Sequence, residues 1–297
     1  MLVCAGVCGA GAEQTEPAAD PFRWDDVADK VERSERQYRV DAQILLLGAT
    51  IFRRNGVGGG NAAWSDAPEM RRKLEFTGYS NPDRAAGLNR FGFIQEVSNK
   101  RTEFAYFGLM TSSPEESMDS ARKALNPASG EVAFTVIEGG AHGGSVEAQI
   151  TQFQAPASAM VHNREELIRT ARKALGAAVK KPLEFDPRTT AAQPFLHALF
   201  DAYRLGANST TYIYGSRLYS LTLQRASDES ASAAFRKAKL LPPGGSAVKV
   251  IGKIRPPAGK EIEFHIWLEA GASRPIPLRI DYRPKSYLRL VFEAVPG

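Results

Sequence analysis

Residues 262–268 read Ile-Glu-Phe-His-Ile-Trp-Leu, and this stretch decides the class of fold. Large apolar residues stand at every second position, which is the spacing that brings side chains to one face of a β-strand. The residues between them would lie on the opposite face. The stretch therefore predicts a strand with one dry face and one wet face, as in an antiparallel sheet that packs on one side.

The same alternation recurs along the chain. Near the C-terminus it returns in residues 248–254, 278–283 and 288–293, with turn sequences at 256–259 and 283–286. Earlier runs lie at 40–47, 72–77, 91–97, 103–110, 132–137, 146–153 and 218–224. A sheet of about a dozen strands curls or splits. We therefore expect a mainly β (α+β) fold: a curled antiparallel sheet or partly open barrel, with two or three helices against one face.

Helical signals interrupt these runs. Ser-Pro-Glu-Glu at 113–116 is a typical helix start, and it predicts a helix near 113–126. Asn163, followed by Arg-Glu-Glu, opens a second helix near 163–176. Its apolar stripe would consist of Leu167, Ile168, Ala171 and Leu175. The short apolar stretch 194–203 predicts a third helix.

Residues 1–12 differ from the rest of the chain because they carry no charge and are small or apolar. They end in Ala-Gly-Ala, a pattern that signal peptidases cut, and this indicates the remnant of a signal peptide. A disordered cytosolic tail is the alternative. Residues 13–37 would then be a lead-in, with a short helix over 24–37. Residues 38–297 would form a single β-rich domain of a periplasmic or secreted protein.

The composition argues against several classes of function. Both cysteines, Cys4 and Cys8, lie in the signal-like segment, so the mature chain would lack thiol chemistry and disulfides. No later stretch holds about 18 uninterrupted apolar residues, so no transmembrane segment is expected in the mature chain. The net charge of +5 favours an anionic membrane surface as a partner. The basic residues are scattered, however, so no nucleic-acid partner is expected.

Motifs for catalysis and cofactors are missing from the sequence. Residues 56–60 read Gly-Val-Gly-Gly-Gly, without the third glycine of a dinucleotide fingerprint or the Gly-Lys-Ser/Thr of a P-loop. We expect a tight hairpin there. No two of the four histidines have helical zinc-ligand spacing, and no Gly-x-Ser-x-Gly elbow exists. No metal, cofactor or catalytic residue is therefore expected.

The sequence does offer a surplus of apolar and aromatic residues on the expected dry faces. A strongly curved sheet tends to leave internal volume, and large apolar pockets with few polar groups suit lipids. The candidates for lining such a cavity are Tyr219, Leu221, Phe264, Ile266, Ile280 and Tyr282. The candidates for its rim, which would meet an anionic head group, are Arg217, Arg279 and Arg283. Ordinary core packing is the alternative for the apolar set.

Short motifs follow one another in a fixed order. They are Tyr38-Arg39-Val40, Phe185-Asp186, Tyr203-Arg204-Leu205, Arg217-Leu218-Tyr219-Ser220-Leu221, Ile266-Trp267-Leu268 and Pro277-Leu278-Arg279-Ile280. In this order they resemble a family of exported bacterial proteins of unknown function, over most of residues 38–295. That family is similar in fold to the LolA/LolB lipoprotein carriers, which curl an antiparallel sheet over a lipid-binding cavity. The resemblance implies no catalytic residues.

The function expected is therefore non-catalytic binding of a lipid or another hydrophobic small molecule in the cell envelope. Two alternatives stay open. The first is a structural or interaction module of the envelope. The second is a VioE-like enzyme, which would perform chemistry inside the same cavity. His197 and Asp201, one helical turn apart in the third expected helix, are the pair that such chemistry would use.

Overall fold

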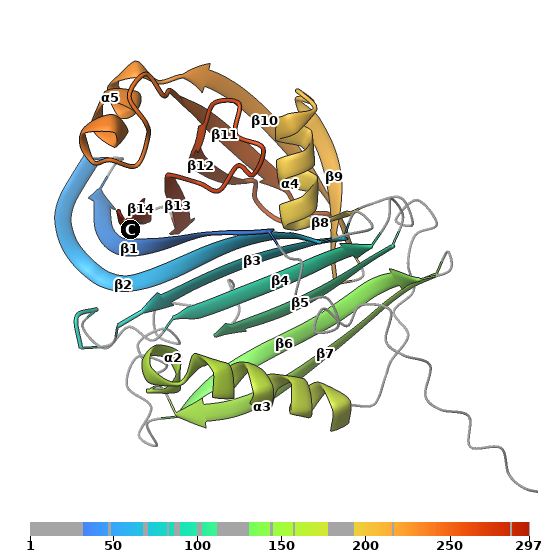
Figure 1. Cartoon of the computed structure of the whole chain (residues 1–297). Helices are drawn as coiled ribbons and strands as arrows, with labels where there is room; N and C mark the ends of the chain where they lie inside the picture. The colour runs from blue at the N-terminus through green and yellow to red at the C-terminus, as the bar shows by residue number, and fades with distance from the viewer. Residues whose placement is uncertain are drawn as a thin grey trace, which may run out of the picture.

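A computed structural model describes residues 32–46, 49–67, 71–81, 83–85, 90–99, 103–111, 131–142, 145–156, 158–177, 193–215, 217–285 and 287–296. Within these residues, fourteen strands form one sheet (Figure 1). The strands are β1 (Glu32–Leu46), β2 (Ala49–Ala67), β3 (Arg71–Ser80), β4 (Phe91–Asn99), β5 (Glu103–Thr111), β6 (Glu131–His142), β7 (Ser145–Pro156), β8 (Gln193–Pro194), β9 (Ser209–Tyr214), β10 (Arg217–Ser227), β11 (Ala247–Arg255), β12 (Ile262–Glu269), β13 (Arg279–Lys285) and β14 (Leu288–Ala294).

The two ends of the described chain meet in the middle of the sheet. The strand order is β7-β6-β5-β4-β3-β2-β1-β14-β13-β12-β11-β10-β9-β8, and every pair is antiparallel except β8–β9. Apart from β1–β14, each strand pairs with its neighbour in the sequence, which is how a meander forms. The mainly β fold with a curled antiparallel sheet is thus confirmed. β1 begins at Glu32, so the helix expected over 24–37 is wrong for residues 32–37.

The sheet curls until one end overlaps the other. Ile213 of β9 and Leu218 of β10 pack on Phe104 and Ile137, which lie on the inner face of β5 and β6. The hydroxyl of Tyr106 donates a hydrogen bond to the carbonyl oxygen of Gly215 at 2.8 Å. Side-chain packing, rather than strand pairing, therefore joins these two ends of the sheet.

The glycine-rich run at 56–60 lies inside β2, which corrects the hairpin expected there. The register of β1 and β2 shifts between Val40 and Ala42, opposite this run. A Cβ atom on Gly58 would lie 2.0 Å from the carbonyl oxygen of Tyr79 in β3. The run therefore allows β2 to bend around the core and to approach β3 closely.

The helices lie on both faces of the sheet. They are α2 (Ala159–His162), α3 (Arg164–Ala177), α4 (Phe195–Arg204) and α5 (Glu229–Lys237). α3 and α4 confirm the helices expected near 163–176 and 194–203, whereas the one expected near 113–126 lies outside the described residues. Two adjacent residues of β4 show this: Phe93 belongs to the hydrophobic cluster that includes α3, and Ile94 packs against the hydrophobic cluster that includes α4. Helices on one face only were expected, but α3 and α4 cover opposite faces.

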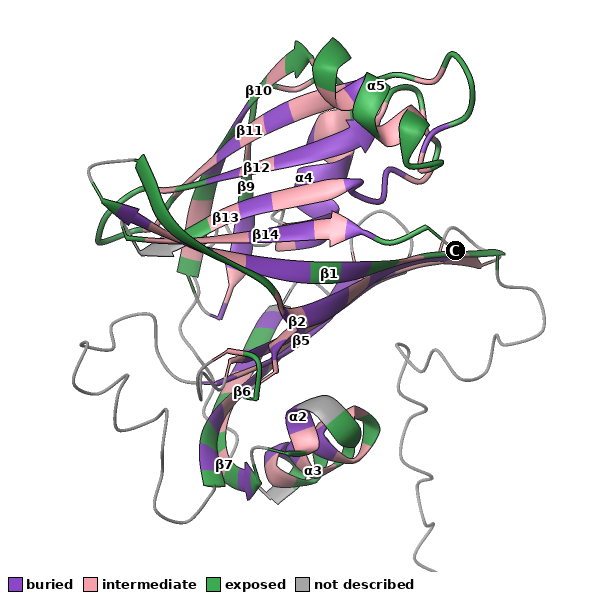
Figure 2. Cartoon of the chain, turned by 90° about the vertical axis from the view of Figure 1, so that its left-hand side faces the viewer, coloured by how far each residue is buried: buried purple, intermediate pink, exposed green. Residues whose placement is uncertain are grey.

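The apolar side of α3 packs against the sheet. In α3, the expected stripe is confirmed because Leu167, Ala171 and Leu175 are buried against the outer face of the sheet, while the opposite side is exposed (Figure 2). α5 was not expected from the sequence. It begins after Asp228, whose carboxylate accepts a hydrogen bond from the backbone N–H of Ala231, which is a typical N-cap.

Candidate functional site

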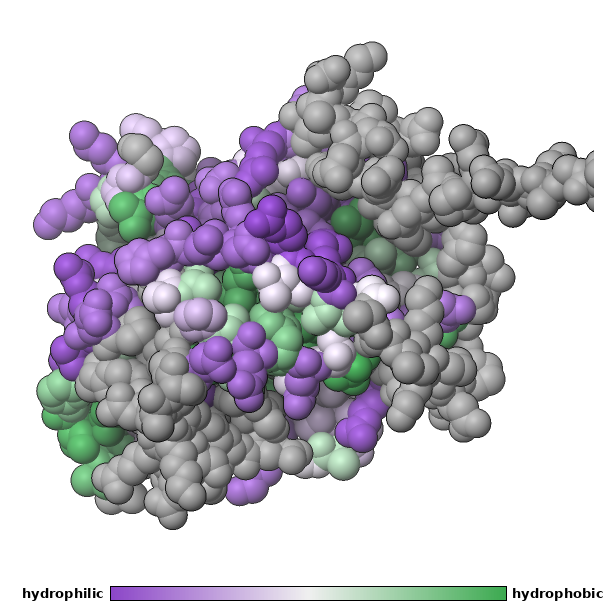
Figure 3. All heavy atoms as spheres, turned by 90° about the horizontal axis from the view of Figure 1, so that it is seen from below, coloured by the Kyte–Doolittle hydropathy of each residue, from purple (hydrophilic) through white to green (hydrophobic). Residues whose placement is uncertain are grey.

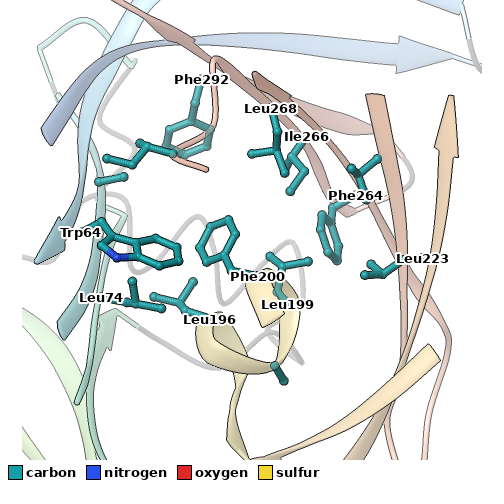
Figure 4. Close-up of a cluster of buried hydrophobic side chains, with 14 of the residues drawn as sticks. Trp64, Leu74, Leu196, Leu199, Phe200, Leu223, Phe264, Ile266, Leu268 and Phe292 are labelled. Atoms are coloured by element: carbon teal, nitrogen blue, oxygen red, sulfur yellow. The ribbon is translucent and has the colours of Figure 1, made fainter. Parts of the chain in front are cut away.

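The main hydrophobic core lies inside the curl, where α4 packs on the inner face of the sheet (Figure 4). Leu196, Leu199 and Phe200 of α4 are buried there. The ring of Phe200 lies 5.5 Å from that of Trp64, measured between centroids. The apolar side chains of α4 thus fill part of the interior of the curled sheet.

A carboxylate from the sheet holds the N-terminus of α4. The two oxygens of Glu96 in β4 accept hydrogen bonds from the backbone N–H groups of Leu196 and His197, at 2.8 and 2.9 Å. Nδ1 of His197 also lies 3.0 Å from Glu96 Oε2, and both side chains are only 2% exposed. Pro194, the residue before the helix, supplies no side-chain cap. Glu96 therefore satisfies N–H donors that the first turn of a helix leaves unpaired.

An ion pair holds the other end of α4. Oδ1 of Asp201 lies 2.7 Å from Nη1 of Arg72 in β3. The guanidinium of Arg72 also lies over the ring of Trp64, 4.9 Å from its centroid. His197 and Asp201 are therefore each bound to a different strand. The pair considered for a catalytic role instead anchors a helix at two points.

Beyond the N-terminus of α4, the inner face carries apolar side chains that remain partly exposed. We call this set the inner-face patch. It consists of Ala42, Tyr219, Ile254, Tyr282 and Leu290. Cross-strand pairing connects several of its members, since Leu290 of β14 lies opposite both Ala42 and Tyr282. Tyr219 stacks on Tyr212 at 5.1 Å, and Tyr212 contacts Phe195 at the start of α4. The patch therefore continues the core past the end of the helix.

The residues predicted to line a cavity all belong to this inner face. Leu221, Phe264 and Ile266 are buried in the main core. Tyr219, Ile280 and Tyr282 are partly buried and pack against it. Burial raises the pKa of both tyrosine hydroxyls above the ordinary value. The phenols of Tyr219 and Tyr282 therefore stay neutral at physiological pH.

The three arginines predicted for the rim are separated. Arg217 and Arg283 are exposed. The charge of Arg217 opposes the effect of burial on the pKa of Tyr219, so the two side chains are close enough to interact. Arg279 lies on the outer face, 3.5 Å from Asp281 and over the ring of Trp267. Of the three, Arg217 is the one that approaches the inner-face patch.

The outer face holds two buried carboxylates that the sequence did not reveal. Asp41 and Asp281 both lie opposite Val291, one on each side of β14. Arg53 donates to Asp41 at 2.9 Å, and Arg289 donates to Asp281 at 3.0 Å. In the sequence, an aspartate inside an alternating run was the available sign of such a carboxylate. Its arginine partner could not be found in the same way, because it comes from another strand. These pairs stabilise the middle of the sheet rather than form a site.

A surface pocket of about 590 Å³ lies elsewhere, beside the C-terminal end of α5. It is lined by Arg236, Lys239, Leu240, Leu241, Pro242 and Pro243. Within the described ranges, no three His, Cys, Asp or Glu side chains gather as metal ligands. No helix in the same ranges is long and apolar enough to cross a membrane.

No protein-family model matches the chain, and no curated protein matches it. Among solved structures, the chain is similar to the crystal structure of a beta-barrel-like protein of domain of unknown function DUF1849 from Brucella abortus. The match covers 90% of this chain and 96% of that chain, with 9% sequence identity and a TM-score of 0.49. The likeness to LolA/LolB carriers stays a prediction from the sequence.

Proposed function

We propose that this is an exported, non-catalytic envelope protein that holds a hydrophobic ligand, such as a lipid or an acyl chain, against its inner-face patch. The observation that carries the proposal is the partial exposure of apolar side chains on an inner face beyond the end of α4. Covering apolar side chains of this kind with an apolar ligand is favourable, by about 0.8 kcal/mol of binding free energy for each methylene group buried.

The chemistry of the patch also favours binding over catalysis. Its side-chain polar groups are the hydroxyls of Tyr219 and Tyr282, which are protonated at neutral pH and whose pKa burial raises further. Glu96 and His197, which are buried ionisable groups of the core, are engaged with each other and with α4. Arg217 would supply a charge-assisted hydrogen bond to a phosphate or carboxylate head group.

One observation favours a second candidate, a structural or interaction module of the envelope. Leu196, Leu199 and Phe200 of α4 already cover the inner face next to the patch. In such a module the patch would be the margin of an ordinary core, and the protein would act through its outer surface. A ligand that contacts the patch would distinguish the two candidates.

The first experiment is native mass spectrometry, with lipid extraction, on protein purified from its own envelope. The second replaces Tyr282 by tryptophan and measures quenching of its fluorescence by brominated acyl chains. The wild type is the control for the three native tryptophans: Trp64 is buried beside Phe200, Trp267 lies on the outer face, and Trp24, which lies outside the described residues, is present in both proteins. We expect quenching in Tyr282→Trp well beyond that of the wild type, and a melting temperature that rises with ligand concentration.

The opposite result would be equally clear. If the purified protein carries no lipid, and acyl ligands neither quench the Tyr282→Trp variant nor raise the melting temperature, ligand binding at the patch is wrong. The interaction module would then replace it as the proposed function.

A further inference from the structure

The β1–β2 hairpin ends in apolar side chains that project into solvent. Within the described residues, seven large hydrophobic side chains are exposed; three of them lie here, and a fourth, Tyr287, lies beside them just before β14. We call these four the apolar tip: Leu46, Ile51, Phe52 and Tyr287. The first three are 59%, 61% and 56% exposed. Apolar surface is visible at the lower left of Figure 3, on the side where β2 bends round in Figure 1.

The end of β1 and the beginnings of β2 and β14 build this tip together. The backbone N–H of Leu45 donates to the carbonyl oxygen of Tyr287 at 2.8 Å, which joins the end of β1 to the β13–β14 turn. Ile44 lies opposite Phe52 in β2 and opposite Leu288 in β14. The tip is therefore supported by strand pairing on both sides of β1, with a register shift between β1 and β2 after Ile44.

The charged residues in the two segments that form the tip are all basic. Residues 44–54 and 282–290 together contain four arginines and one lysine, and no aspartate or glutamate. Arg53 and Arg289 are paired with the buried Asp41 and Asp281. Arg54 and Arg283 are exposed, and no ion pair joins either of them to another described residue. They are thus available to an anionic partner.

Core packing does not explain this arrangement, because Leu46, Ile51 and Phe52 are each more than half exposed. Isolated exposed apolar residues are normal on a protein surface, but a cluster of them marks a binding face. Exposed apolar side chains with basic residues next to them fit the surface of a bilayer. The apolar side chains enter the boundary between head groups and acyl chains, and the basic residues contact the phosphates. A protein partner would more often offer polar groups for mixed contacts.

We propose that the apolar tip docks the protein on an anionic phospholipid bilayer, with Ile51 and Phe52 inserted and Arg54 and Arg283 against lipid phosphates. This goes beyond the proposed function, because docking requires no ligand inside the sheet. The two are connected in space, however, since the paired residues Ile44 and Leu288 lie two positions from Ala42 and Leu290 of the inner-face patch along β1 and β14. A docked tip would hold the patch near the membrane surface.

The experiment is sedimentation of the full chain with vesicles of phosphatidylglycerol, compared with vesicles of phosphatidylcholine. We expect binding to the anionic vesicles that weakens when the salt is raised from about 0.05 M to about 0.5 M. The double variant Ile51→Ser/Phe52→Ser should reduce the partition coefficient by about tenfold or more. The double variant Arg54→Glu/Arg283→Glu should reduce it by a similar factor at low salt.

Matched controls come from the same chain. Ile150→Ser/Leu205→Ser removes two apolar side chains that are 55% and 83% exposed but lie away from the tip. Lys173→Glu/Arg204→Glu makes the same change in net charge at exposed positions elsewhere. Both controls should sediment with anionic vesicles within about twofold of the wild type.

Three outcomes would overturn the proposal. The first is no binding of the wild type to anionic vesicles at low salt. The second is equal weakening by the tip variants and by their controls. The third is a dimer in solution that Ile51→Ser/Phe52→Ser abolishes, without any vesicle binding. Quenching of Tyr282→Trp by soluble brominated acyl chains, measured without vesicles, reports on ligand binding separately.

Discussion

Oε2 of Glu96 lies 3.0 Å from Nδ1 of His197 and 2.9 Å from the backbone nitrogen of the same residue. The carboxylate belongs to β4 and the histidine to the first turn of α4, about one hundred residues later in the chain. A strand thus supplies the N-cap that the helix lacks in its own sequence. Because both side chains are buried, the contact also fixes where α4 enters the core.

Replacing Glu96 by glutamine should therefore destabilise the protein by about 1.5–3 kcal/mol, because an amide group would face backbone N–H donors that need an acceptor. Chemical denaturation at neutral pH would measure the loss. Glu263→Gln is the control, since that carboxylate is 49% exposed, and its effect should stay within about 0.5 kcal/mol. Equal effects of the two substitutions would contradict the capping role.

Arg72→Lys should loosen the other end of α4. Lysine keeps the charge but loses the planar contact over Trp64 and the guanidinium geometry toward Asp201. We expect a loss of about 1 kcal/mol and faster amide hydrogen exchange in α4 than in the wild type. Exchange in α3, which packs on the opposite face, should not change. Uniform acceleration in both helices would contradict a local anchor.

Gly58→Ala should destabilise the protein strongly, because its new methyl group would lie 2.0 Å from the carbonyl oxygen of Tyr79. A backbone atom cannot move aside as a flexible side chain does, so we expect a loss of about 1–3 kcal/mol. Gly92→Ala, in β4, is the matched control. Apart from its two neighbours in the chain, no atom lies within 4 Å of its new Cβ. The melting temperature of Gly92→Ala should therefore be unchanged or slightly higher than that of the wild type. The reverse ranking would contradict the close approach of β2 and β3.

Asp41 should make the stability depend on pH in the acid range. Burial acts to raise its pKa, but hydrogen bonds from Arg53 and from the N–H of Gly56, with the charge of Arg39, lower it overall. A carboxyl whose pKa is lower in the folded state stabilises the protein above the unfolded value of about 3.9. This contribution disappears as the pH falls through the lower, folded value.

Asp41→Asn should therefore be less stable than the wild type at neutral pH, by about 1.5–3 kcal/mol. The difference between the two should shrink as the pH falls below about 4. Urea unfolding at a series of pH values would test this. A difference that is constant down to the acid limit would show that the charge of Asp41 does not contribute.

Lys239→Gly should stabilise the protein. Lys239 adopts a φ of 59°, the left-handed conformation that follows the end of α5, where the N–H of Leu240 donates to the carbonyl oxygen of Phe235. Glycine adopts this conformation without strain, so we expect a gain of about 0.5–1 kcal/mol. Lys237→Gly, inside the helix, should cost about the same amount. Differential scanning calorimetry would show two shifts of opposite sign.

The sequence by itself determined the strands and the kind of sheet they form. Alternation in residues such as 262–268 has a period that matches a strand and no other element, and short turns between the runs require antiparallel pairing. The apolar stripe of Leu167, Ala171 and Leu175 likewise predicted the buried side of α3 before any neighbour was known. These are local patterns, so a linear reading is sufficient to find them.

Tertiary structure alone decided how the elements meet. Whether α4 lies inside the curl and α3 outside depends on the direction in which the sheet bends, which alternation does not encode. The partners Glu96 and His197, or Asp41 and Arg53, are chosen by strand register and curvature, since a one-residue shift would turn each side chain to the other face. The apolar tip has the same origin: Ile51 and Phe52 resemble any strand residues in sequence, and their exposure depends on where the first residues of β2 lie in the folded sheet.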